Sequence, residues 1–274
     1  MTLSVFQTNP VLGEVEQNLS SVEVSLGEAD CDLLVLPELF ATGYLFETSE
    51  QAHALGEPVP DGPTTRRVER WARDLGATIV AGLVERDGST HYNSAIVVTP
   101  RGWLGTYRKT HLFYEETRHF TPGDSGFEVW TVTDRSRRSY RLGVMVCFDW
   151  FFPESARTLA LRGADIIAHP SNLVLPHCPR SMPVRALENG VFTATANRVG
   201  SESSSRDTLT FIGQSVVCSP EAEVIAQASE ATPAILTVEV DLQSARDKAL
   251  NPFNDRIGSR RSALYAAEAT ASTA

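Results

Sequence analysis

Three side chains that follow predicted strands have the chemical types needed for catalysis through a covalent intermediate. Cys147 directly follows the apolar run YRLGVMV, Glu38 follows DLLVLP, and Lys109 lies in TYRKTHLF, just after another strand-like run. Loops at strand ends are open to ligands while the strands hold them rigidly. A thiol, a carboxylate and an ammonium group are the nucleophile, base and positive charge that such chemistry employs.

Each of the three also has a structural interpretation. A free cysteine is usually buried and packs like a small apolar side chain. Glu38 alone fits a surface carboxylate at a strand end, and Lys109 beside Arg108 fits a solvated loop pair. The other three cysteines keep this structural interpretation: Cys31, Cys178 and Cys218. Among these, Cys178 is expected in a loop, and it is the one of the three whose loop could face a cleft.

Composition bounds the class of protein. The 274 residues are 42% hydrophobic, enough for the core of one large domain or two small ones. A net charge of −10 and a pI of about 5.1 argue against nucleic acid as a partner. The four cysteines are scattered, no apolar run is long enough to span a membrane, and we expect no signal peptide because the first strand-like run begins at residue 3. We therefore expect a cytoplasmic protein with free thiols.

Periodicity predicts a mixed α/β chain. Strands are expected at 3–8, 32–37, 77–85, 92–99, 140–146, 165–170, 191–197, 210–218 and 234–240. Helices are expected at about 14–29, 64–75, 154–162 and 181–189, the last two ending before Gly163 and Gly190. Several strands are apolar on both faces, which is typical of strands inside a layered structure. Without a repeat or linker, we predict one domain over 1–265 and a frayed tail over 266–274.

The segments PELFATGY, YRKTHLF and CFDWFFPE occur in this order, and together they resemble the nitrilase, or carbon–nitrogen hydrolase, superfamily. The resemblance continues through HPSNLVLP, RALENGVFTATANRVG and FIGQS to NPFNDR. It is greatest to small prokaryotic aliphatic nitrilases and omega-amidase-like enzymes. The resemblance implies a four-layer α-β-β-α sandwich. It also implies a homodimer or larger homo-oligomer, with the segment after Pro153 and the C-terminal stretch at or near the interface.

The same resemblance implies the residue roles. Cys147 would be the nucleophile, Glu38 the general base, and Lys109 the charge that stabilises the oxyanion together with the backbone N–H of Phe148. Glu116 matches a second glutamate beside the lysine, and Glu115 is the alternative if the match shifts by one residue. We expect substitution of Glu38 or Lys109 to change stability little.

The implied reaction is hydrolysis of a non-peptide carbon–nitrogen bond in a small aliphatic nitrile or amide. It would proceed through a thioimidate or thioester and release ammonia and a carboxylic acid, with no metal or organic cofactor. An N-carbamoyl amine is the alternative substrate. The expected substrate-binding residues are Tyr44, Phe113, Trp150, Asn172 and Leu173. Aromatic side chains among them indicate a small, partly apolar pocket.

Three other interpretations of the sequence compete with this function. A Cys-His hydrolase would use Cys147 with His111, His119 or His169, although none has a recognisable dyad context. A metal site is disfavoured because the histidines and cysteines lack ligand spacing. A non-catalytic binding or assembly homologue would be expected to have lost the cysteine, glutamate or lysine, and all three are present.

Overall fold

Two six-stranded sheets form the centre of the molecule in the computed structural model, which describes residues 1–27 and 29–266. The first sheet has the order β14-β1-β2-β3-β4-β5. Its strands are β1 (Thr2–Gln7), β2 (Leu33–Val35), β3 (Thr78–Asp87), β4 (Thr90–Thr99), β5 (Gly102–Arg108) and β14 (Ala234–Glu239). β1, β2 and β3 run parallel to one another, and the remaining pairs are antiparallel.

The second sheet has the order β13-β12-β9-β8-β7-β6. Its strands are β6 (Val129–Thr133), β7 (Ser139–Val144), β8 (Ile166–Pro170), β9 (Phe192–Ala196), β12 (Val216–Cys218) and β13 (Val224–Gln227). Its central strands β7, β8 and β9 are parallel. In both sheets a parallel centre therefore carries antiparallel edges.

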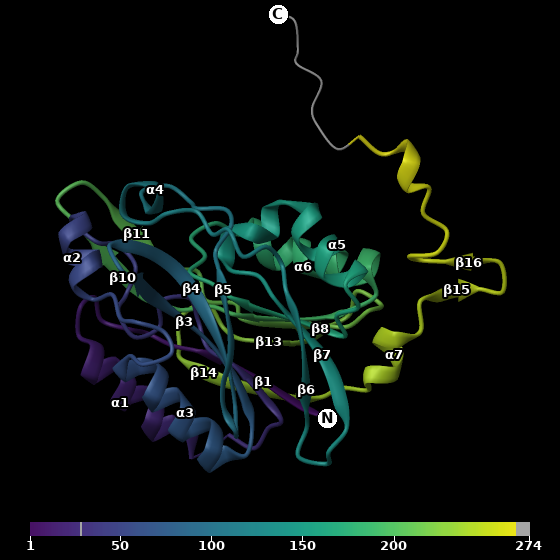
Figure 1. Ribbon diagram of the computed structural model, residues 1–274, viewed down its shortest axis with the longest axis horizontal. Helices are drawn as coiled ribbons and strands as arrows, with labels where there is room; N and C mark the ends of the chain where they lie inside the picture. Colours follow the sequence, from purple (N-terminus) through teal and green to yellow (C-terminus); the bar gives the residue numbers. More distant parts are fainter. Residues whose placement is uncertain (28, 267–274) are drawn as a thin grey trace, which may run out of the picture.

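Helices cover the outer face of each sheet, which completes the predicted α-β-β-α sandwich (Figure 1). α1 (Val15–Leu26) and α3 (Pro63–Leu75) pack on the first sheet, while α5 (Pro153–Leu161) and α6 (His177–Asn189) pack on the second. The sequence of β2 is continuously apolar because both of its faces are buried. Leu33 and Val35 pack toward the other sheet. Leu34, between them, packs with the residues of α1 and α3.

The remaining elements are short. They are α2 (Ser49–Ala54), α4 (Glu116–His119), η1 (Cys147–Phe151), β10 (Ser201–Ser203), β11 (Thr208–Thr210), α7 (Leu242–Arg246), β15 (Ala249–Asn251), β16 (Asn254–Asp255) and η2 (Ser262–Leu264). α4 and η1 each carry candidate catalytic residues. The segment after α7 extends away from the layered body (Figure 1). In the described part of the chain, no helix has the length and apolar character needed to cross a membrane.

Two predicted elements need correction. The expected strand at 210–218 is not continuous. Only its first residue lies in β11 and its last three residues lie in β12, and these two strands belong to different sheets. α6 begins at His177 rather than at residue 181, so Cys178 lies inside a helix and is fully buried. The helix ends as predicted: Gly190 adopts the left-handed conformation with φ 60°. Of the predicted tail, residues 267–274 lie outside the described residues.

Candidate active site

Cys147 begins the short helix η1 in a conformation that few non-glycine residues adopt. Its φ is +42°, in the left-handed region, which costs on the order of 1–3 kcal/mol and persists only where the surroundings enforce it. Asp149, fully buried, braces the turn by accepting hydrogen bonds from the Val146 amide at 2.8 Å and the Tyr107 hydroxyl at 2.7 Å. The junction between β7 and η1 therefore holds the thiol in one defined position.

Glu38 lies just after the end of β2, next to β3. The two backbone segments approach so closely there that a Cβ on Gly82 would lie 2.6 Å from the Glu38 Cα. The carboxylate is fully buried, and its Oε1 accepts from Lys109 Nζ at 2.6 Å and from Asn93 Nδ2 at 2.7 Å. Its Oε2 is buried without a hydrogen-bond partner among the described residues. One oxygen thus fixes the side chain, and the other is free to accept a proton.

Lys109 follows β5, where its backbone N–H still pairs with the Asn93 carbonyl of β4 at 2.8 Å. Its fully buried ammonium lies between two carboxylates, 2.6 Å from Glu38 Oε1 and 2.7 Å from Glu116 Oε1. Burial alone lowers the pKa of Lys109, but Glu116 and Glu38 outweigh it and raise that pKa overall. The lysine therefore stays charged. Two of its three N–H donors are occupied, which leaves one for a ligand.

Glu116, and not its neighbour Glu115, is the glutamate beside the lysine. It lies on α4, and its Oε1 also accepts from the Tyr44 hydroxyl at 2.6 Å. Burial, opposed by Lys109 and reinforced by Glu38, raises the pKa of Glu116 to about 7. Glu115 instead pairs with Arg206 on the surface, at 3.1 Å.

The thiol of Cys147 belongs to the same cluster electrostatically. Burial, followed by the negative charge of Glu38, raises its pKa well above the ordinary range. Lys109 and the backbone N–H of Asn172 oppose this rise without reversing it. The resting nucleophile is therefore a thiol, so its proton must leave as it attacks.

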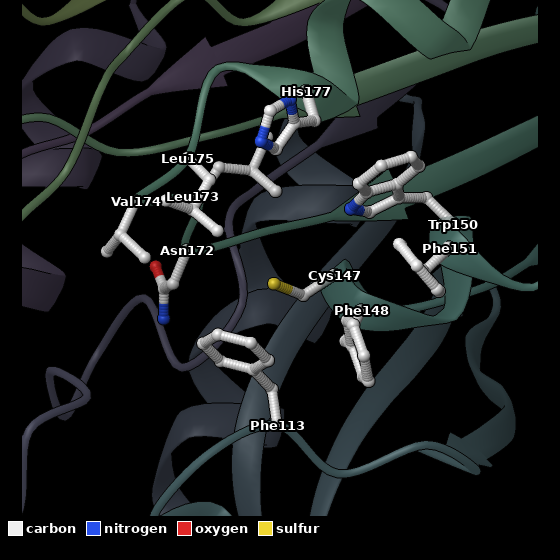
Figure 2. Close-up of a pocket in the computed structure, with 10 residues that line it drawn as sticks. All are labelled: Phe113, Cys147, Phe148, Trp150, Phe151, Asn172, Leu173, Val174, Leu175 and His177. Carbon is white, nitrogen blue, oxygen red and sulfur yellow. The ribbon is translucent and has the colours of Figure 1, made fainter.

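A cavity of about 270 Å³ opens onto the Cys147 sulfur (Figure 2). Its lining is mostly aromatic and aliphatic: Phe113, Cys147, Phe148, Trp150, Phe151, Asn172, Leu173, Val174, Leu175 and His177. The Asn172 carboxamide and the Phe113 ring flank the sulfur on one side, and Trp150 lies on the other (Figure 2). A volume of this size suits a small organic molecule.

Four of the five expected substrate-binding residues line this cavity, and Tyr44 does not. Tyr44 is buried beside Phe211, and its hydroxyl is bonded to Glu116. The expectation for Tyr44 failed because its place directly after PELFATG does not show in which direction its side chain points. The sequence reasoning also missed several lining residues: Phe151, Val174, Leu175 and His177. These residues lie close in sequence to the residues that were expected. Their position next to CFDW and HPSNL was therefore the signal that could have identified them.

The three histidines of the alternative dyad have other partners. The His169 ring bonds the carbonyl oxygen of Cys147 at 2.9 Å instead of its sulfur. His111 bonds Asp149 at 2.7 Å, and His119 contacts Ser49 at 3.2 Å. Over residues 1–27 and 29–266, no group of three histidine, cysteine, aspartate or glutamate side chains is arranged to hold a metal ion.

The fold and the cluster around Cys147 together define a cysteine-dependent hydrolase. Residues 2–249 match the family model for carbon–nitrogen hydrolases. A nitrilase from Pyrococcus abyssi is 51% identical over 262 residues, which cover 94% of this chain and 97% of the relative. The chain therefore belongs to the carbon–nitrogen hydrolase family, within the nitrilase superfamily.

More distant relatives act on different carbon–nitrogen bonds. An N-carbamoylputrescine amidase from Arabidopsis thaliana is 29% identical over 268 residues, covering 89% of this chain and 88% of the relative. The crystal structure of an amidase from Nesterenkonia sp. superposes with a TM-score of 0.77 at 26% identity, covering 96% and 94% of the two chains. A variant of that amidase carries acrylamide on its active-site cysteine (TM-score 0.73, 27% identity, 90% and 96% covered).

Proposed function

We propose that this enzyme hydrolyses the carbon–nitrogen bond of small, uncharged aliphatic amides or nitriles through a covalent intermediate on Cys147. The observation that carries the proposal is the pairing of Lys109 with Glu38, whose second oxygen has no partner, beside a thiol that opens into an apolar cavity. A base, a positive charge and a nucleophile are thus available at one place.

In the first half-reaction, Glu38 Oε2 takes the proton of Cys147 as the sulfur attacks the amide carbon. The π electrons of the carbonyl move onto its oxygen, where the third N–H of Lys109 and the backbone N–H of Phe148 stabilise the charge. Glu38 then returns the proton to the departing nitrogen. The C–N bond breaks, ammonia leaves, and a thioester remains.

The second half-reaction repeats these roles with water. Glu38 removes a proton from the water as it attacks the thioester, and the same donors hold the oxyanion. The C–S bond then breaks, the thiol regains a proton, and the carboxylic acid leaves. A nitrile enters the same path as a thioimidate, with one additional hydration before ammonia is lost.

The lining of the cavity supports an uncharged substrate chain. Among the described lining residues, His177 is the only one besides Cys147 with a titratable side chain, and none is an arginine, lysine, aspartate or glutamate. A carboxylate or ammonium group on the substrate would be desolvated there without an opposite charge, which costs several kcal/mol. The N-carbamoyl amine alternative is disfavoured wherever the amine is cationic.

Asn172 supplies the main polar contact of the cavity wall. The residue is 4% exposed, and neither its Nδ2 nor its Oδ1 has a hydrogen-bond partner among the described residues. A buried carboxamide without partners is costly, so a ligand that pairs with it gains affinity. We assign Asn172 to orienting the substrate's polar group.

Ammonia release from matched substrates tests the proposal. Butyramide and butyronitrile should have kcat/KM values at least ~10-fold above those of succinamate and N-carbamoylputrescine, because the latter two bring a charge into the cavity. Cys147→Ala should abolish turnover of every substrate. Equal or better turnover of a charged substrate would refute the assignment, and turnover by Cys147→Ala would refute the mechanism.

We further propose that the chain forms a homodimer through the face of α5 and α6 and the segment that follows α7. The short β15–β16 hairpin cannot bury its own apolar side chains. Four large apolar side chains of this segment are exposed: Leu250, Phe253, Leu264 and Tyr265. Phe253 is the most exposed of the four, at 91%.

Sedimentation velocity at several concentrations tests the dimer. Phe253→Ser should shift the association equilibrium toward monomer. Val24→Ser, which changes an 82% exposed residue on α1, is the matched control and should leave association unchanged. A monomeric wild-type protein, or equal effects of the two substitutions, would contradict the proposed interface.

A further inference from the structure

His169 is a fully buried histidine whose position the proposed reaction does not yet explain. It lies on β8, and its Nε2 is 2.9 Å from the carbonyl oxygen of Cys147. Its Nδ1 is 3.0 Å from the Thr195 hydroxyl, and the Ser171 hydroxyl lies within 3.4 Å of both ring nitrogens. The ring thus links the second sheet to the backbone of the nucleophile.

The bonding pattern fixes the tautomer of this ring. A carbonyl oxygen can only accept, so Nε2 must carry a hydrogen, and Nδ1 is then the acceptor for the Thr195 hydroxyl. Burial lowers the pKa of His169 to about 4, although the bond to the Cys147 carbonyl opposes this. The ring is therefore neutral and donates one hydrogen bond to the backbone of the nucleophile.

The carbonyl of Cys147 belongs to the same peptide unit as the N–H of Phe148. In a planar trans peptide these two groups point in opposite directions. Phe148 is the second residue of η1, so no carbonyl within that helix precedes it as an acceptor for its N–H. A bond that turns the carbonyl toward the buried ring therefore turns the N–H toward the cavity side, and it also polarises the peptide.

We propose that His169 is a positioning residue of the oxyanion site: by holding the Cys147 carbonyl, it aims the Phe148 N–H at the oxygen of the bound substrate. The inference rests on the proposed function, because it assumes that Cys147 attacks a C=O or C≡N carbon. His169 itself touches neither the sulfur nor the substrate. His169 therefore stabilises only the charge that develops on the substrate oxygen, when the π electrons of the C=O bond move to oxygen as the S–C bond forms.

Two substitutions of similar polarity separate this role from packing. Gln at position 169 places an amide nitrogen close to the position of the imidazole Nε2, whereas the side chain of Asn is one methylene too short to reach the carbonyl. The two variants are His169→Gln and His169→Asn, and thermal unfolding verifies that each is folded. Should His169→Asn fail to fold, His169→Leu provides the same comparison.

Three measurements are made on each variant. The first is kcat and KM for butyramide. The second is the inhibition constant of butyraldehyde, which adds to the thiol and places a tetrahedral oxygen in the oxyanion site. The third is the rate constant for modification of Cys147 by methyl methanethiosulfonate, a displacement at sulfur that develops no charge on a carbonyl oxygen.

In His169→Asn we expect kcat to fall about 10- to 100-fold, up to the usual effect of one lost oxyanion donor, with KM changed less than about threefold. The aldehyde should bind weaker by a similar factor, while thiosulfonate modification stays within about twofold of wild type. His169→Gln should recover most of both losses.

Unchanged kcat and aldehyde affinity in the Asn variant would overturn the proposal. An equal loss in the thiosulfonate rate would also overturn it, because the nucleophile itself would then be displaced. If wild type hydrolysed no amide or nitrile, the proposed function would fail. The contrast between aldehyde and thiosulfonate would still measure the role of His169 separately.

Discussion

Replacing Glu38 with Gln separates the base from the scaffold of the site. Glu38→Gln keeps the shape and the Oε1 acceptor that Lys109 and Asn93 bond, and it removes the negative charge and the free basic oxygen. A positioned general base contributes roughly 10²- to 10⁴-fold, so kcat should fall by at least ~100-fold.

The same substitution should make the thiol more acidic. Burial and then the charge of Glu38 raise the pKa of Cys147, because a nearby negative charge disfavours the thiolate. Removing the Glu38 charge removes part of the cause that disfavours the thiolate, so the pKa of Cys147 should fall. Turnover and thiol reactivity at neutral pH therefore change in opposite directions.

The assay is the pH dependence of methyl methanethiosulfonate modification, measured beside butyramide hydrolysis in both proteins. The modification midpoint of Glu38→Gln should lie at lower pH than that of wild type, and its kcat should be at least ~100-fold lower. A variant with nearly normal turnover would show that Glu38 is not the base. A midpoint that moves upward would refute the electrostatic account.

Three further predictions follow from the cluster. Lys109→Ala leaves the buried carboxylates of Glu38 and Glu116 uncompensated, so it should cost about 3–5 kcal/mol in denaturant unfolding and at least ~100-fold in kcat; wild-type stability would contradict this. Tyr44→Phe removes the hydrogen bond to Glu116 and should lower kcat several-fold with a small change in KM, and a change confined to KM would instead favour substrate contact. Dialysis against a chelator should leave turnover unchanged, because Lys109 supplies the positive charge at the site; chelator-sensitive turnover would contradict this.

The buried ion pairs of Lys109 replace the expectation that its substitution would change stability little with the opposite prediction. The sequence TYRKTHLF is polar and reads as a loop, and nothing in it shows that the ammonium will be fully buried between two carboxylates. Burial of this kind depends on contacts between segments far apart in the chain. A local pattern does not contain that information.

The layers and the strand ends were predictable because they depend on local pattern. β2 reads as continuously apolar since both of its faces are covered, and Gly190 ends α6 since a left-handed residue is needed there. The positions of Cys147, Glu38 and Lys109 follow from such strand ends.

What escaped prediction lies in short elements and in side-chain direction. α4 has four residues, too few to show helical periodicity, yet it carries Glu116. Tyr44 could be named as a candidate from its neighbours in sequence, and His169 only as one of three histidines for an alternative dyad. Their partners, the Glu116 carboxylate and the Cys147 backbone carbonyl, lie on other segments of the chain that only the fold brings near them.

The central claim, a covalent intermediate on Cys147, is tested most directly by trapping it. All four cysteines are free, so inactivation by a thiol reagent alone does not identify the nucleophile. Wild-type enzyme is quenched in acid during butyramide turnover, and its peptides are mapped by mass. The account predicts added acyl mass on the peptide spanning 143–157 and none in Cys147→Ala. An adduct on Cys178 instead, or undiminished turnover by Cys147→Ala, would contradict it.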